Sequence, residues 1–391
     1  MRQVISTDLS DEQDDILLGA PLSGVILISG PPGSGKTVMA FHRAEALATK
    51  FETVNVVMFN SVLSRFSNNA TSEEKIQVKT FHSWFYRWWQ AATKTRVIES
   101  AKFKPNFTAL FDDLIKRESE DNLDLKKLNW GHVIIDEAQD FSNKHYQFLN
   151  KVKTAFYSGD EMPSATILAD ENQMLFDDNS TLKQIRDTFK IDKASNLFSL
   201  TKNYRNTDQI NSFIQYFYVG LETGMTMPSG RNGNLPELVF TNNFSKTAKY
   251  IAKYARIYQN HEIAVIVPGN YQRKQYYAAL DELLIDSNFN VQSFASGSKV
   301  HTADSLDFDK EGTITILNRA SCKGLEFDAV FIPELSSMPI DNADLDKFKM
   351  SMYVMCSRAR THLTIFVEDE NSLVLRHLPG KGDNILEYKD V

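Results

Sequence analysis

The glycine-rich segment Gly30–Thr37 contains the residues that point most clearly to a chemical function. Its sequence, GPPGSGKT, fits the pattern G-x-x-x-x-G-K-[ST], in which successive backbone N–H groups surround a polyphosphate. In this pattern the lysine neutralises phosphate oxygens and the final hydroxyl coordinates Mg²⁺. The nucleotide-binding residues that it predicts are Gly33, Ser34, Gly35, Lys36 and Thr37. A surface turn rich in glycine and proline is the alternative interpretation.

Two flanking segments give this loop a structural context. Residues 25–28 form an apolar run that predicts a strand, and residues 38–47 are rich in helix-forming residues. A strand, a glycine loop and a helix in this order place the loop at a helix N-terminus, where anions bind.

A second candidate site is the acidic pair Asp136 and Glu137, which follows the apolar run Val133–Ile135. At a strand end in a nucleotide-binding sheet, the first acid holds Mg²⁺ and the second orients and deprotonates a water molecule. Exposed turn acids are the alternative. We consider that alternative weaker because the pair follows both a phosphate loop and an apolar strand.

Polar side chains also follow two other predicted strands, at residues 165–169 and 76–79. The residues concerned are Asp170, Gln173 and Phe176 after the first of these strands, and Thr80 and His82 after the second. Side chains in such positions line the ligand crevice of a parallel sheet. The segment 81–89 is dense in aromatic residues, which at helical spacing pack in a core more often than they bind a ligand. A core position is also the alternative for Phe176.

Gln13 lies in a segment that predicts a helix beginning near Ser10. An amide can pair with both the donor and the acceptor of an adenine edge, and Gln13 lies just upstream of the phosphate loop. An ordinary exposed helix residue is the alternative.

Composition restricts the class of protein. The chain has 391 residues, of which 42% are hydrophobic and 24% charged, as in globular proteins large enough for two cores. Two cysteines are too few for a disulfide framework or a cysteine-based zinc site. No apolar run reaches the ~18 residues of a membrane span and the first eight residues lack a signal-peptide pattern, so we expect a cytoplasmic protein. The net charge of −7 argues against a protein that coats nucleic acid, but it is compatible with a local basic cleft.

Strand and helix patterns alternate along the chain and restart near residue 200. They predict an α/β protein with two domains, 1–199 and 200–391, and a small helical insertion at about 90–130. In the second half we predict strands at 238–240, 263–267, 313–317, 329–332 and 363–367, and helices at 244–258, 271–284 and 345–357.

Three further positions carry charged groups in less specific surroundings. Lys323–Asp328 lies between two predicted strands, Arg205 follows a short predicted strand at 195–200, and Arg358 lies at the end of a predicted helix. Alone, Arg205 would be interpreted as a surface residue and Arg358 as a partner of the C-terminal helix dipole.

Together these segments resemble the UvrD/Rep-like superfamily 1 helicases, in the family's motif order and over nearly the whole chain. Gln13 matches the adenine-reading glutamine, Gly30–Thr37 the Walker A loop and Asp136–Asp140 the DExxD-type Walker B segment. The other matches are Thr80–Ser83 with a strand-contacting motif, Asp170 and Gln173 with D-x-x-Q, Asn203–Arg205 with N-Y-R, Lys323–Phe327 with K-G-L-E-F and Arg358 with a T-R-A-like motif.

The resemblance implies two RecA-like P-loop NTPase domains with parallel sheets. It implies ATP and Mg²⁺ as ligands and movement on single-stranded nucleic acid, with DNA favoured over RNA and 3′–5′ polarity. The implied site residues are Lys36, Glu137, Gln173, Arg205 and Arg358 for catalysis; Thr37 and Asp136 for the metal; Gln13, Gly324 and Glu326 for the nucleotide; and Thr80, His82 and Phe176 for nucleic acid.

The chain also departs from the family's pattern. Asn318 and Ala320 stand where Thr and His are usual, and Asp178 stands where a tryptophan is usual. The spacings leave little room for the family's two large inserted subdomains. An alternative function is therefore a regulatory subunit that binds nucleic acid under nucleotide control, hydrolyses ATP without processive unwinding, and partners a nuclease or effector.

Overall fold

The computed structural model describes residues 9–51, 53–59, 75–176, 178–294, 306–307, 311–340 and 345–390. The first eight residues, on which part of the cytoplasmic expectation depends, lie outside these ranges. The chain forms two compact units. The N-terminal unit contains Gly35–Leu200 and the described residues up to Gly30, and the C-terminal unit contains Pro31–Ser34 and the described residues from Thr201 onward.

The N-terminal unit is built on a six-stranded sheet in the order β3-β2-β6-β7-β1-β8, with every neighbouring pair parallel. Its strands are β1 (Val25–Ser29), β2 (Val54–Met58), β3 (Ile76–Thr80), β6 (His132–Ile135), β7 (Ser164–Ala169) and β8 (Leu197–Ser199). Its longer helices are α1 (Asp11–Gly19), α2 (Lys36–Ala48), α4 (Phe81–Thr93), α7 (Asn143–Phe156) and α8 (Leu182–Phe189). The central strands are buried along their whole length, as expected of a parallel sheet covered on both faces.

The segment after α4 contains more than the helices predicted for the insertion. It holds an antiparallel hairpin of β4 (Glu99–Ala101) and β5 (Lys104–Pro105), followed by α5 (Phe107–Ser119) and α6 (Leu125–Leu128). The aromatic residues of α4 that include Trp84, Phe85 and Trp89 are buried, so most of the aromatic-rich stretch is core. His82, on the same helix, is exposed.

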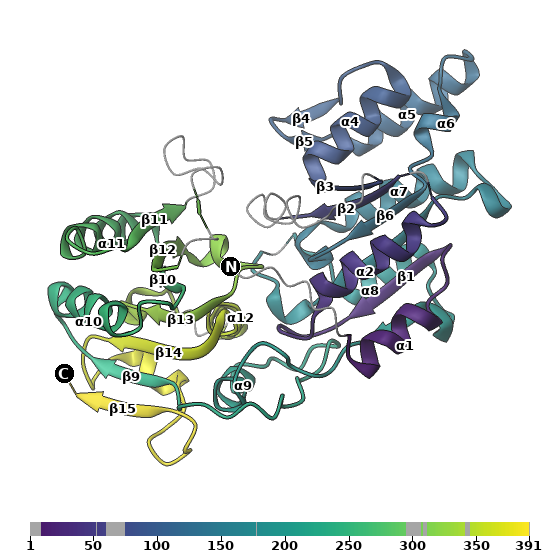
Figure 1. Cartoon of the computed structure of the whole chain (residues 1–391). Coiled ribbons are helices and arrows are strands. Elements are labelled where there is room, and N and C mark those ends of the chain that lie inside the picture. Colours follow the sequence, from purple (N-terminus) through teal and green to yellow (C-terminus); the bar gives the residue numbers. More distant parts are fainter. Residues whose placement is uncertain are drawn as a thin grey trace. The chain divides into compact units, whose positions relative to one another are not determined.

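The C-terminal unit is built on a seven-stranded sheet in the order β11-β12-β10-β13-β14-β9-β15, again with all pairs parallel. Its strands are β9 (Glu237–Phe240), β10 (Ile263–Val267), β11 (Asn290–Phe294), β12 (Thr313–Asn318), β13 (Phe327–Ile332), β14 (Ala359–Val367) and β15 (Glu387–Asp390). Figure 1 shows α10 (Phe244–Ile257) and α11 (Asn270–Leu283) along one face, and α9 (Asp208–Gln215) and α12 (Leu345–Cys356) along the other. The strands and helices predicted for this half are confirmed, with shifts of a few residues at their ends.

The two sheets share one strand order. The N-terminal order β3-β2-β6-β7-β1-β8 corresponds to β12-β10-β13-β14-β9-β15, and β11 is an added edge strand. The protein is thus an α/β protein with two parallel sheets, consistent with two RecA-like domains. No helix within the described ranges is long and apolar enough to cross a membrane.

Candidate nucleotide and nucleic-acid sites

The predicted phosphate loop connects β1 to α2, as the sequence pattern requires. Gly35 has φ +86° and is the N-cap of α2, which receives no hydrogen bond from a capping side chain. Glycine has no side chain with which to cap the first N–H groups of α2, and helix N-termini are places where anions bind. The Lys36 ammonium is buried and donates a hydrogen bond of 2.6 Å to the Gly30 carbonyl, inside the loop.

Gln13 is buried beside this loop, so its interpretation as an ordinary exposed residue is wrong. It belongs to a capping box at the start of α1, where its Oε1 accepts a hydrogen bond of 3.0 Å from the Ser10 N–H. Its Nε2 lies against Gly35, where a Cβ would displace it, and the φ of +86° at Gly35 independently favours glycine at that position. A local capping role and a base-reading role thus use the same amide group.

The predicted metal residues lie next to each other. The Thr37 hydroxyl donates a hydrogen bond of 2.7 Å to Oδ2 of Asp136, and Oδ1 of Asp136 accepts one of 2.9 Å from the Glu137 N–H. Burial, together with the neighbouring Glu137, raises the pKa of Asp136 to about 6. One carboxylate and one hydroxyl suit Mg²⁺, which takes its remaining ligands from phosphates and water. In the part of the chain that the structure describes, no group of three His, Cys, Asp or Glu side chains could hold a metal.

Glu137 is connected to the end of the next strand through a glutamine. Its Oε2 accepts a hydrogen bond of 2.7 Å from Nε2 of Gln139, whose Oε1 accepts one of 2.9 Å from the Asp170 N–H. Asp170 in turn accepts 2.8 Å from Nε2 of Gln173. Burial raises the pKa of Asp170, against the opposing influence of Lys36. Gln139 has no predicted role from sequence; its position two residues after the candidate general base Glu137 is the signal that points to it.

The three predicted nucleic-acid residues have different surroundings. Thr80 is the N-cap of α4 and its hydroxyl accepts a hydrogen bond of 3.3 Å from the Ser83 N–H. His82 is exposed and bonds through Nε2 to the Phe103 carbonyl at 3.1 Å. Phe176 is 54% exposed, so its interpretation as a core residue is wrong.

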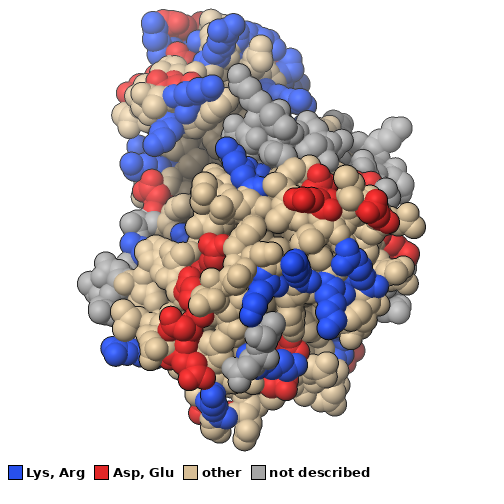
Figure 2. Space-filling model, turned by 90° about the vertical axis from the view of Figure 1, so that its left-hand side faces the viewer, with Lys and Arg blue, Asp and Glu red and all other residues tan. Residues whose placement is uncertain are grey.

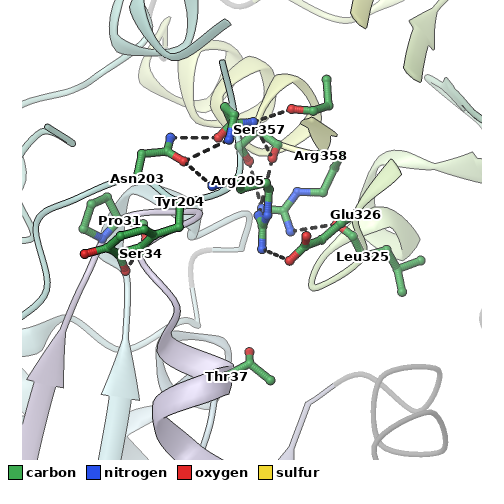
Figure 3. Close-up of polar contacts among 12 residues, drawn as sticks. Pro31, Ser34, Thr37, Asn203, Tyr204, Arg205, Leu325, Glu326, Ser357 and Arg358 are labelled. Carbon is green, nitrogen blue, oxygen red and sulfur yellow. Dashed lines mark hydrogen bonds and ion pairs between the residues drawn. The ribbon is translucent and has the colours of Figure 1, made fainter. Parts of the chain in front are cut away.

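Two predicted arginines, Arg205 and Arg358, lie near each other in the C-terminal unit (Figure 3), close to the amino ends of β13 and β14. Phe327 and Ala359 begin these strands and face each other in register, so the residues before them, Glu326 and Arg358, are neighbours. Nη2 of Arg205 lies 2.7 Å from Oε1 of Glu326. Burial alone would raise the pKa of Glu326, but the Arg205 guanidinium outweighs it and holds that pKa below its usual value.

Arg358 is almost fully buried and donates to backbone oxygens. Its Nε donates a hydrogen bond of 2.9 Å to the Val354 carbonyl in the last turn of α12. Nη2 donates 2.8 Å to the Ser357 hydroxyl. The predicted helix-dipole role is therefore compatible with its geometry, beside any role at a phosphate.

Asn203 holds the Arg205 loop in shape, a role that is not apparent from the sequence. Its Oδ1 accepts hydrogen bonds of 2.9 Å and 3.0 Å from the N–H groups of Arg205 and Asn206. The C-terminal unit also includes Pro31–Ser34, and Figure 3 shows Tyr204 beside Pro31 and Ser34. The Tyr204 N–H donates a hydrogen bond of 2.8 Å to the Gly33 carbonyl. A Cβ on Gly33 would lie 2.4 Å from Asn203 Oδ1, which explains why this position is glycine.

The K-G-L-E-F segment and its departures from the family have local explanations. Gly324 has φ +73°, and Lys323 is buried. The Asn318 side chain caps the short 3₁₀ helix Arg319–Cys322, where it accepts 2.9 Å from the Ser321 N–H. Ala320 is exposed within that turn.

Comparison with known protein families and with solved structures gives matches to both. The AAA domain family matches residues 13–176, which implies a P-loop NTPase that binds and hydrolyses a nucleoside triphosphate. The C-terminal domain of a possible DNA helicase from Lactobacillus plantarum WCFS1 is 21% identical, with a TM-score of 0.33, over 47% of this chain and 98% of that one. The search of curated proteins found no match.

Proposed function

We propose that this protein is an ATP-driven motor on single-stranded nucleic acid, similar to the UvrD/Rep-like superfamily 1 helicases, that works in the cytoplasm. The observation that carries the proposal is the connected set of side chains at the carboxyl ends of β1, β6 and β7. Thr37 pairs with Asp136, and Glu137 is joined through Gln139 to Asp170. A phosphate loop, a metal-binding pair and a fixed carboxylate are the parts that triphosphate hydrolysis needs.

Each side chain has a distinct task in this proposal. The Lys36 ammonium and the N–H groups at the start of α2 bind the β- and γ-phosphates. Thr37 and Asp136 hold Mg²⁺, which when bound neutralises charge on the phosphate oxygens. Glu137 orients the attacking water and accepts its proton, and Gln139 and Gln173 keep the carboxylates of Glu137 and Asp170 in place.

We propose that residues 1–199 and 200–391 act as two RecA-like domains. Arg205 and Arg358 would stabilise the charge that develops on the γ-phosphate, and Gly324 and Glu326 would complete the nucleotide site. Glu326 holds Arg205 at 2.7 Å, so the guanidinium is preorganised by the protein itself. Gln13 would read the adenine edge with its amide.

Thr80, His82 and Phe176 are proposed to contact the nucleic acid, with DNA favoured over RNA. The 3′–5′ polarity is carried over from the family resemblance alone. Phe176 supports the proposal because a half-exposed ring after β7 is free to stack on a base.

A second function is favoured by the small size of the insertion, whose longest helix is the 13-residue α5. A regulatory subunit would hydrolyse ATP and bind nucleic acid without processive unwinding, in partnership with a nuclease or effector. Strand-stimulated ATP turnover without duplex unwinding would identify this function.

The deciding experiment measures ATP turnover of the full chain with and without single-stranded DNA or RNA, followed by unwinding of a duplex with a single-stranded tail. The motor proposal expects stimulation by single strands and ATP-dependent unwinding. Turnover that neither DNA nor RNA changes would overturn both nucleic-acid functions and leave only an ATPase.

A further inference from the structure

The hairpin of β4 and β5 presents an aromatic ring between two lysines. Its strands are joined through Lys102 and Phe103, and Lys104 follows at the start of β5. All three side chains are exposed, and the Phe103 ring is 59% exposed. The Lys102 ammonium lies 5.3 Å from the centre of the Phe103 ring. The hairpin tip is therefore a flat apolar ring bordered by two positive charges.

The backbone at Phe103 is in a conformation that its side chain disfavours. Its φ is +60°, in the left-handed region, where a bulky residue is an outlier and glycine is preferred. Such strain persists only where surrounding contacts impose it, and it concentrates at functional positions. With more than half of the ring exposed, burial does not account for a phenylalanine at this position.

Four hydrogen bonds hold the tip in this conformation. The Phe103 N–H donates 3.2 Å to Oε1 of Glu99, an oxygen that also accepts from the Tyr86 hydroxyl. The Ser100 hydroxyl donates 3.1 Å to the Lys104 carbonyl. The Phe103 carbonyl accepts 3.1 Å from Nε2 of His82. Because a carbonyl can only accept, Nε2 of His82 carries the proton.

The region around the hairpin has the opposite charge to the whole protein. Residues 79–106 contain six Lys or Arg and one acidic residue, a net charge of +5, whereas the chain has −7. In Figure 2, several Lys and Arg side chains and a few acidic ones lie at the height at which Figure 1 shows β4 and β5. A local basic surface on an acidic protein selects a negatively charged partner.

We propose that the β4–β5 tip is a single-strand binding site, in which Phe103 stacks on a base while Lys102 and Lys104 bind the adjacent phosphates. Beside the strand contact proposed for it above, His82 is a positioning residue, because its Nε2 fixes the Phe103 carbonyl. The inference rests on the proposed function, because it adds a contact to the same nucleic-acid site. A single strand fits better than a duplex, since only unpaired bases offer a free face to an exposed ring.

The first experiment measures binding of a fluorescently labelled single-stranded oligonucleotide by Phe103→Ala, Phe103→Trp and Phe103→Gly. Loss of the ring should weaken binding about tenfold or more, and Phe103→Trp should retain it. Phe103→Gly should lose binding while its thermal midpoint stays unchanged or rises, because glycine accepts φ +60°. Tyr258→Ala, which removes a ring of 46% exposure from the C-terminal unit, is the matched control and should bind normally.

Salt dependence tests the two lysines. Removing both Lys102 and Lys104 should flatten the plot of log affinity against log salt by about 1.4, because each phosphate contact to a single strand contributes about 0.7. The control pair Lys183 and Lys193, which are exposed on and after α8, should leave the slope unchanged.

His82 is tested by replacement with and without a donor group. His82→Ala should weaken binding severalfold and His82→Gln should restore part of it, because an amide N–H can reach the same carbonyl. A fluorescent base analogue in the oligonucleotide should be quenched by stacking with wild type and not with Phe103→Ala.

The outcomes separate this inference from the function on which it rests. If wild type neither binds single strands nor is stimulated by them, the proposed function fails and this site with it. If wild type binds and Phe103→Ala binds equally well, the site is overturned and the function stands. The site would also be overturned if charge-reversing variants of Lys102 and Lys104 bound single strands as wild type does but no longer bound an acidic protein.

Discussion

Two strand ends, one in each sheet, have the same backbone and different chemistry. Glu137 follows β6 with φ 50° and ψ 44°, and Glu334 follows β13 with φ 53° and ψ 40°. Each leads into a three-residue 3₁₀ helix, Ala138–Asp140 or Leu335–Ser337. β6 and β13 also occupy equivalent places in the shared strand order. A left-handed glutamate at this corner is therefore a feature of the fold and does not by itself make a catalytic site.

The difference lies in what surrounds each corner. Asp136 precedes Glu137 and pairs with Thr37, whereas Pro333 precedes Glu334. At the start of α10, the Asn243 side chain accepts 3.1 Å from the Lys246 N–H and so caps the helix itself. At the start of α2, Gly35 provides no such cap. The helix after β1 thus begins without a capping side chain at its N-cap, whereas the helix after β9 is capped by its own sequence.

The largest expected effect comes from removing charge at the N-terminal corner. Glu137→Gln should retain ATP binding and lower turnover by orders of magnitude, because it removes the group that accepts the proton from water. Lys36→Ala should abolish turnover and also weaken binding. Glu334→Gln has the same backbone and should leave turnover unchanged, as measured by steady-state phosphate release. Equal losses in Glu137→Gln and Glu334→Gln, or near-normal turnover in both, would contradict the assignment.

The second comparison concerns the arginines at the amino ends of β13 and β14. Arg205→Ala should lower turnover on the order of 10³-fold with little change in ATP affinity, because a charge that acts only in the transition state is lost. Arg360 lies near the start of β14, and its Nη1 is 3.6 Å from Oδ1 of Asp328. Arg360→Ala provides the matched control.

Arg358→Ala should also lower turnover, but it leaves buried carbonyls without their donor and so costs about 1–3 kcal/mol of unfolding free energy as well. Turnover must therefore be compared at a temperature where urea titration shows the variant folded. Full activity in both Arg205→Ala and Arg358→Ala would mean that these residues do not serve the nucleotide.

The two sheets should also differ in how a histidine in each makes the free energy of unfolding depend on pH. Burial, and then Arg43, lower the pKa of His132 in β6 to about 3, from about 6.5 in an unfolded chain. At a pH between these two pKa values, His132 binds a proton in the unfolded state but not in the folded state. The free energy of unfolding therefore falls as the pH falls, by about 2 kcal/mol at pH 5. His132→Gln should flatten that part of the pH dependence in urea titrations. His362→Gln should flatten the pH dependence less, because Glu237 opposes the lowering of the His362 pKa by burial. An equal effect of the two substitutions would contradict this difference between the sheets.

The smallest expected effect is on single-strand binding, and it compares an exposed residue after β7 with one after β14. Phe176→Ala should weaken single-strand binding about tenfold, and the thermal midpoint should not change because the ring is half exposed. Leu373, exposed after β14 beyond the acidic run Glu368–Glu370, gives the control Leu373→Ala, which should bind normally. A lower midpoint with unaltered binding would assign Phe176 a packing role.

Local sequence predicted the elements that are apolar and continuous, such as β10, and the loop that follows β1. It missed β11 and β15, because their sequences NVQSF and EYKD are largely polar and become strands only through pairing with β12 and β9. It also missed the two-residue β5. Pairing partners far apart in the chain cannot be derived from such short segments.

The candidate site divides in the same way. Glycine, lysine and acidic residues at fixed spacing directly predicted the glycine loop between β1 and α2 and singled out Asp136, which pairs with Thr37. Gln139 and Asn203 could not be assigned, because an amide acquires a role only when folding brings its partners within reach. The exposed position of Phe176 likewise depends on tertiary packing and not on local pattern.

The left-handed backbone at Glu137 lowers the stability of the protein at a position that the proposed activity requires to be glutamate. A glutamate in this conformation costs about 1 kcal/mol relative to glycine, so Glu137→Gly should be the more stable and the inactive protein. Laboratory selection for heat resistance alone would thus discard the carboxylate that we propose to be catalytic. Its persistence in a natural sequence would depend on continued selection for turnover.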